Sequence, residues 1–273
     1  MSSRSLTTEA LVLSVSPFAD DHRNVLLLTP QELGCALVPA TLFGGARSKL
    51  RGMVAAYQSG RIWLYSNPIK NSNKITDFSV SSYRMELRES LVRSWCAAVC
   101  SEVTIKTCGT VEWRLVNAFL DGLCVSDDEG CKRGLLRFLW RLLRLSGIAP
   151  DIFRCSSCGA ALAAATSAGV DTSDDITNAE LNGATQNGME AAAVYSPAED
   201  ACFCTSCRRY DDAPFQISVE ALRYLHAVTE KAPGYSRHLP LSPAAYGALK
   251  RFLFFLTEKM IGGQLKTFQA GYI

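Results

Sequence analysis

Two Cys-x-x-Cys pairs are the feature that most constrains how this chain can fold. Cys155 and Cys158 form the first pair, and Cys204 and Cys207 form the second. Each pair sets two thiolates on a tight turn, and four sulfurs complete a tetrahedral shell without an open position, as a structural zinc ion requires. We therefore expect one structural Zn2+ per chain, with segments far apart in the sequence meeting at the metal.

Other interpretations of these cysteines stay open. The pairs are either metal ligands or unrelated redox and core thiols, and Cys202 competes with Cys204, although its spacing to Cys207 does not suit a knuckle. The interval at about 160–200 is rich in Ala, Thr, Asn and Gly, carries several acidic residues and has no Lys or Arg. So few large apolar residues cannot offset the entropy of ordering, and the pattern predicts a disordered acidic insertion.

Charge is distributed unevenly despite a formal net charge of +2. Residues 33–76 contain no Asp or Glu, and a glycine-flanked basic segment lies at 44–52. Such a stretch favours phosphate binding over a merely solvated loop. Trp63 and Tyr65 share one face of a strand, where they either stack on bases or belong to the core. The predicted nucleic-acid-binding residues are Arg23, Arg47, Lys49, Arg51, Arg61 and Lys70.

Short apolar runs separated by turns predict a β-rich domain over residues 1–80. We expect strands at 10–13, 25–28, 35–39, 54–58 and 62–66, with the last two joined by a hairpin at Ser59-Gly60. Five short strands suit a closed OB-fold barrel, which offers one face and two loops to a nucleic-acid strand.

Helical spacing of apolar residues begins at about residue 82, so the fold class is α+β. We expect a helical domain at 81–150, a four-cysteine zinc segment at 151–212, and a second helical part at 213–273. The helix at 132–145 places four arginines on one face, which is either a solvated surface or a binding site for an acidic partner. These arginines are Arg133, Arg137, Arg141 and Arg144.

Several catalytic patterns are missing from the sequence. It contains no Walker phosphate loop, no G-x-G-x-x-G and no H-E-x-x-H, and its three histidines are scattered. This absence favours a binding protein over an enzyme. No segment approaches the ~20 apolar residues of a membrane helix, so we expect a cytoplasmic protein without membrane contact.

Four motifs resemble the bacterial RecO family of recombination and repair proteins, in the family's order and spacing. They are TEALVL at 8–13, LTPQELG at 28–34, GARSKLRG at 45–52 and GIAPDIFRCSSCG at 147–159. The segment FADD at 18–21 departs from the family's usual Gly-Glu pairing. The resemblance implies an N-terminal OB barrel, a helical domain and a zinc knuckle.

By this resemblance the function is DNA repair through recombination. Members of the family bind single- and double-stranded DNA, anneal complementary strands and engage the acidic C-terminal tail of single-strand-binding protein. With RecR they place RecA on coated DNA, which implies a nucleoid-associated protein. Arg47, Lys49 and Arg51 match the family's basic loop. The alternative function is a zinc-ribbon adaptor that acts mainly through protein contacts, whereas a nuclease would need a carboxylate cluster that the sequence does not show.

Overall fold

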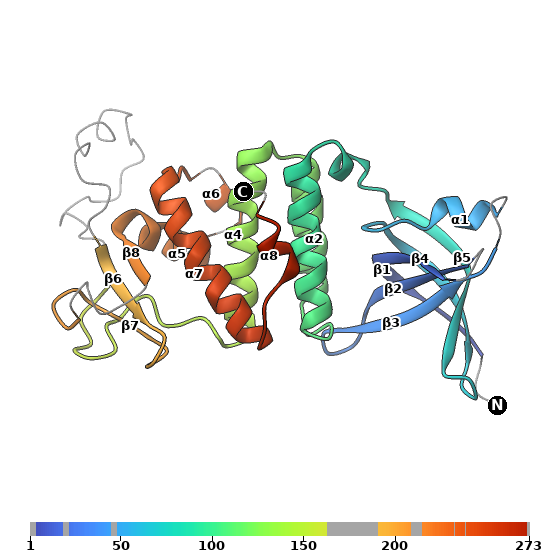
Figure 1. Cartoon of the computed structure of the whole chain (residues 1–273), viewed down its shortest axis with the longest axis horizontal. Helices are drawn as coiled ribbons and strands as arrows, with labels where there is room; N and C mark the ends of the chain where they lie inside the picture. The colour runs from blue at the N-terminus through green and yellow to red at the C-terminus, as the bar shows by residue number, and fades with distance from the viewer. Residues whose placement is uncertain are drawn as a thin grey trace. The chain divides into compact units, whose positions relative to one another are not determined.

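A computed structural model describes residues 4–18, 22–44, 48–162, 191–208, 215–231, 233–237 and 239–271 (Figure 1). Its contacts divide the chain into two compact units. Unit 1 comprises residues 1–135 and 261–273, and unit 2 comprises residues 136–260. None of the described helices combines the length and the apolar character needed to cross a membrane.

Unit 1 begins with a closed barrel of five strands in the order β1-β2-β3-β5-β4, which confirms the predicted OB-like barrel. One parallel pairing, between Thr41 and Lys74, closes the barrel, and the other strand pairs are antiparallel. The short helix α1 (Lys49–Met53) connects β3 to β4. The strands are β1 (Ser5–Phe18), β2 (His22–Pro30), β3 (Cys35–Leu42), β4 (Ser59–Asn67) and β5 (Ser72–Ser82).

The barrel core follows the alternation of each strand. Successive side chains point to opposite faces, so every second residue of a strand enters the interior. The buried core residues are Ala10, Val12, Val25, Leu27, Ala40, Leu42, Val54, Ile62, Leu64, Ile75 and Phe78. Leu11, Leu13 and Leu28 alternate with these core residues and are buried as well, although they do not belong to the core cluster.

The hairpin predicted at Ser59-Gly60 is wrong. Residues 54–58 form no strand, since Tyr57 has a left-handed backbone (φ 71°), and β4 pairs instead with β5. A Cβ on Gly60 would lie 2.1 Å from the carbonyl oxygen of Ser79. The glycine therefore permits the close approach of β5 at a shift in register and does not form a turn.

Hydrogen bonds between side chains and the backbone join the elements in the helical part of unit 1. The Ser101 hydroxyl donates to the carbonyl of Leu13 at 2.9 Å, which attaches α2 to β1. The Glu102 carboxylate accepts the backbone N–H groups of Lys266 and Thr267, which fixes the start of α8. The elements are η1 (Met85–Arg88), α2 (Leu91–Lys106), α3 (Trp113–Cys124), the first half of α4 (Asp128–Leu145) and α8 (Lys266–Gln269).

Unit 2 combines the second half of α4 with a small sheet in the order β7-β6-β8 and three further helices. Within the interval predicted as a disordered insertion, residues 191–200 form β6 and the turn to β7, while 163–190 lie outside the described residues. The further elements are β6 (Ala191–Ser196), β7 (Ala201–Phe203), β8 (Phe215–Ser218), α5 (Val219–Glu230), α6 (Pro233–Arg237) and α7 (Pro243–Ile261).

Candidate nucleic-acid interface and candidate metal centre

A polar groove of about 400 Å³ runs over the outer face of β2 and β3. The β4–β5 turn forms one wall, and the Asn73 side-chain amide ties that wall to β3 by donating to the Pro39 carbonyl at 3.0 Å. This face and this loop are the parts of an OB barrel that contact oligonucleotides. Hydroxyl and amide groups line the groove, from Ser14, Ser16, Asn24, Thr41, Asn71, Ser72 and Asn73.

Two rings and one cation continue the same outer face beyond the groove. His22 lies two residues before Asn24, and its ring meets that of Phe43 edge-on with centroids 4.6 Å apart. The Lys74 ammonium lies 5.3 Å from the Phe43 centroid, within the range of a cation–π contact. Phe43 is 42% exposed, so its ring is accessible to a stacking base. We call His22, Phe43 and Lys74 the aromatic–lysine cluster.

The predicted basic residues occupy different parts of the barrel. Lys49 and Arg51 lie on the helix α1, Lys49 being exposed, and Arg47 lies outside the described residues. Lys70 is exposed in the β4–β5 turn, where its backbone N–H donates to the Asn67 side chain at 3.2 Å. Arg23 shares the core side of β2 with Val25, opposite the groove, and is half-buried.

Arg61 lies in the sequence stretch without acidic residues, but the fold places an acidic residue beside it. The register of β1 with β4 sets Glu9 opposite Arg61, and the two side chains form an ion pair at 3.4 Å. Both side chains are well exposed, 63% and 47%, so the pair contributes little stability. It nevertheless reduces the positive charge that Arg61 offers to a phosphate.

Trp63 and Tyr65 lie outside the barrel core. Ile62 and Leu64, between and beside them, are fully buried, so the two aromatic residues belong to the outer face of β4. Tyr65 is 37% exposed, and its hydroxyl accepts a hydrogen bond from Arg4 at 3.3 Å. This face of β4 is not among the surfaces that line the groove.

Two of the four arginines predicted to share one face of α4 form hydrogen bonds within unit 2. Arg137 donates to the Tyr224 hydroxyl at 3.2 Å, and Arg144 donates to the Thr229 carbonyl at 3.4 Å, so both side chains pin α5. Burial, reinforced by the nearby charge of Arg137, lowers the pKa of Arg141. Arg133, nearer the start of α4, is half-buried.

The four cysteines of the two pairs meet in unit 2. Their sulfur atoms all lie within 4.8 Å of one another, and those of Cys158 and Cys204 are 3.8 Å apart. A tetrahedron with metal–sulfur bonds of about 2.3 Å has edges of about 3.8 Å, so the cluster has the right size for a metal ion. The predicted four-cysteine knuckle is confirmed, and the site is able to hold a metal ion.

Backbone geometry prepares one of these sulfurs for ligation. Gly159 adopts a left-handed conformation (φ 71°) and folds the first knuckle so that its N–H donates to the Cys155 carbonyl. The strand β7 then delivers Cys204, whose N–H donates to the Cys155 sulfur at 3.3 Å. Burial opposes ionisation, but backbone N–H groups of Cys204, Cys158 and Ser157 together lower the pKa of Cys155 to about 6. The thiolate needed for metal binding is therefore favoured at neutral pH.

The family model described as Recombination protein O C terminal matches residues 113–171. That interval contains α3, α4 and the first cysteine pair. Over this interval the chain is therefore similar to the RecO family. The match confirms the resemblance and supports a RecO-type role in DNA repair and recombination, with DNA and recombination proteins as partners in general. No curated protein matches the chain in a sequence comparison.

The aromatic–lysine cluster is the part of this candidate interface that sequence reasoning missed. Phe43 directly follows β3, and Lys74 lies on β5, a strand that meets β3 at the single parallel pairing that closes the barrel. Strand alternation does place Phe43 on the same face as Thr41, two residues earlier. Without the register of β3 against β5, however, no sequence signal brings Lys74 over the Phe43 ring.

Proposed function

We propose that this RecO-family chain is a recombination mediator that binds single- and double-stranded DNA through its barrel and acts without enzymatic chemistry of its own. The observation that carries the proposal is the polar groove beside the aromatic–lysine cluster. Stacking on Phe43 suits unpaired bases, and Lys49, Lys70 and Lys74 offer ammonium groups to phosphates. From the resemblance to the RecO family, we place this activity in the cytoplasm, in association with the nucleoid.

Strand annealing follows from the same electrostatics. Two approaching strands repel each other, and a basic surface that neutralises phosphates of both lowers that repulsion. In this proposal the chain anneals complementary strands and, with RecR, helps to load RecA on DNA coated by single-strand-binding protein. The half-buried Arg141 is a candidate contact for the acidic C-terminal tail of that protein, because its charge is partly desolvated beside Arg137.

We further propose that the metal ion is zinc. Four thiolates in a closed set match a structural zinc site, and elemental analysis of protein purified without chelator should give about one zinc per chain. Iron at comparable stoichiometry, or no bound metal, would contradict this assignment.

A matched pair of variants tests the DNA interface. Phe43→Leu removes the ring beside the groove, whereas Tyr65→Leu removes an exposed ring on the outer face of β4. Loss of one stacked base should weaken single-strand binding by about 1–3 kcal/mol in Phe43→Leu and leave Tyr65→Leu nearly unchanged. Fluorescence anisotropy with a labelled oligonucleotide measures both, and a strand-annealing assay should follow the same order.

Two lysine substitutions test the electrostatic contribution to DNA binding. Lys74→Gln should reduce the slope of log affinity against log salt by about 0.7 for single strands if its ammonium meets one phosphate. Lys106→Gln, at the end of α2, serves as the charge-matched control. Equal salt slopes in Lys74→Gln and Lys106→Gln would show that Lys74 does not contact a phosphate. If single-strand binding were also unchanged in Phe43→Leu, the groove would not be the DNA-binding site. Titration with a peptide that ends in acidic and apolar residues separates the alternative, since loss of peptide binding only on changes in Arg133 to Arg144 would favour a protein-contact adaptor.

A further inference from the structure

A second hollow in unit 1 has charged residues in its lining, unlike the uncharged polar groove. It measures about 390 Å³ and lies where the end of β5, η1 and α3 meet. We call it the acidic cleft. Its lining residues are Ser81, Ser82, Tyr83, Arg84, Met85, Glu86, Asp121 and Cys124.

The buried side chain of Arg84 joins the segments that form the acidic cleft. Its backbone is left-handed (φ 49°), and its side chain is only 3% exposed. The guanidinium donates to Asp121 at 2.7 Å, to the Asn117 side chain at 2.9 Å and to the Tyr57 carbonyl at 2.7 Å. Burial of Arg84 leaves its neighbours Tyr83 and Met85 at the surface, 54% and 50% exposed.

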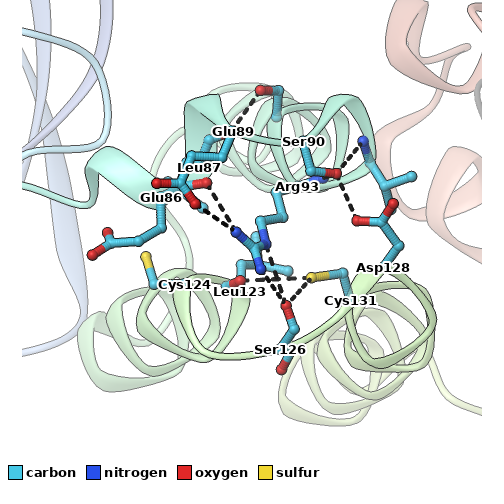
Figure 2. Close-up of polar contacts among 12 residues, drawn as sticks. Glu86, Leu87, Glu89, Ser90, Arg93, Leu123, Cys124, Ser126, Asp128 and Cys131 are labelled. Atoms are coloured by element: carbon cyan, nitrogen blue, oxygen red, sulfur yellow. Dashed lines mark hydrogen bonds and ion pairs between the residues drawn. The ribbon is translucent and has the colours of Figure 1, made fainter.

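A second arginine holds η1 in place. Arg93 donates to the Glu86 carbonyl at 3.4 Å and, through two of its nitrogens, to the Ser126 carbonyl at 3.2 and 2.9 Å (Figure 2). It also forms an ion pair with Glu89 at 3.2 Å. These bonds tie η1 to the end of α3, so both walls of the acidic cleft are fixed.

The carboxylates of the acidic cleft exceed its cations. Arg84 forms an ion pair with Asp121, whose side chain is 57% exposed. Among the described residues, no cation forms an ion pair with Glu86. Figure 2 shows the Glu86 and Cys124 side chains on the same side of the helices. Burial, followed by the charges of Glu86 and Asp121, raises the pKa of Cys124 to about 11, although Arg84 opposes the shift. The thiol therefore stays neutral, and the charged residues of the lining are two carboxylates and one guanidinium.

We propose that the acidic cleft docks a basic segment of a partner protein, with an arginine or lysine facing Glu86 and Asp121 and apolar neighbours on Tyr83 and Met85. Charge complementarity selects this occupant, because carboxylates repel DNA phosphates and attract a guanidinium or ammonium group. The half-exposed Tyr83 and Met85 supply the adaptable apolar contact that a peptide needs. This surface goes beyond the proposed DNA interface and is separate from it in residues and in charge.

Peptide binding to the full chain tests the proposal. The probe is a fluorescein-labelled peptide of alternating leucine and arginine, and its control is the same peptide with glutamate in place of arginine. We expect binding of the basic peptide that weakens with added salt, and no binding of the acidic one. A benzophenone-bearing copy of the basic peptide should crosslink to residues 81–86 or 121–124.

Single substitutions define the contact. Glu86→Gln should weaken the basic peptide about fivefold or more, since one charge-assisted bond is lost, and Met85→Ser should weaken it through lost apolar contact. Glu32→Gln, an exposed carboxylate on the β2–β3 turn, is the matched control. No binding, equal affinity in Glu86→Gln and Glu32→Gln, or crosslinks elsewhere would overturn the proposal.

Two further measurements separate this inference from other occupants and from the DNA interface. Concentration-dependent self-association that Glu86→Gln abolishes would make a second copy of the chain the occupant and overturn the partner assignment. Single-strand binding should be unchanged in Glu86→Gln, and peptide binding should be unchanged in Phe43→Leu. Failure of either surface in its own assay therefore leaves the other standing.

Discussion

The barrel of unit 1 and the cysteine knuckle of unit 2 reach defined structures by different means. The barrel buries a continuous set of apolar side chains from all five strands, including Phe78 at 0% exposure. In the knuckle, Cys158 and Cys207 are exposed, while Cys155 and Leu162 are buried. The barrel therefore gains its stability from apolar burial, whereas we expect the knuckle to depend on metal bonds through its sulfurs.

The largest expected effect comes from removing those sulfur bonds. In Cys158→Ser with Cys204→Ser, we expect loss of bound metal and loss of amide protection in β6, β7 and the knuckle, with the barrel unchanged. The reason is that metal binding to such sites supplies folding free energy, about 10–16 kcal/mol in zinc-finger peptides. Hydrogen–deuterium exchange with mass spectrometry resolves the two regions.

Cys108→Ser is the matched control, because Cys108 is exposed and lies outside the cluster. Equal loss of protection in the barrel of the double variant would show that the two regions do not depend on different forces. Unchanged protection in the knuckle would show that the metal does not organise it.

The same contrast explains what the sequence allowed us to predict. The Cys-x-x-Cys spacing identified the four cysteines that meet, and short apolar runs separated by turns were enough to predict a closed five-stranded barrel. Neither pattern contains the register between strands, which sets Glu9 opposite Arg61 and Lys74 over Phe43. Gly60 was misread for the same reason: its neighbour Ser79 belongs to β5, a strand that the sequence analysis did not identify.

A smaller effect is expected from a single methyl group at that contact. Gly60→Ala would bring a Cβ to 2.1 Å from the Ser79 carbonyl oxygen, so β5 must move. Forced repacking of this kind costs about 1–3 kcal/mol in free energy of unfolding. Urea denaturation of the purified variant measures the loss.

Gly122→Ala is the control for this substitution. A Cβ there meets nothing within 4 Å, and Gly122 lies inside α3, so alanine should raise stability by about 0.5–1 kcal/mol. If both variants lost stability equally, the close approach of β5 would not explain the glycine at residue 60.

The smallest expected effect concerns a charge beside the small sheet of unit 2. Asp200 accepts hydrogen bonds from Lys259 at 2.8 Å and from the Tyr195 hydroxyl at 2.6 Å, and these bonds lower its pKa below the usual 3.8. A depressed carboxyl pKa gives stability that is present above about pH 4 and is lost as the pH falls through the folded-state pKa. Asp200 is 51% exposed, so the contribution is about 0.5 kcal/mol.

Asp200→Asn should therefore be slightly less stable than the parent chain at pH 7, and the difference should shrink below pH 4. Denaturation midpoints of both proteins at matched pH give this difference directly, and release of metal from the knuckle in acid affects both equally. Glu32→Gln should show no such pH-dependent difference, because no described cation forms an ion pair with Glu32. A constant difference for Asp200→Asn from pH 7 to pH 3 would mean that the asparagine disturbs packing around Tyr195, and that the carboxylate charge contributes nothing to unit 2.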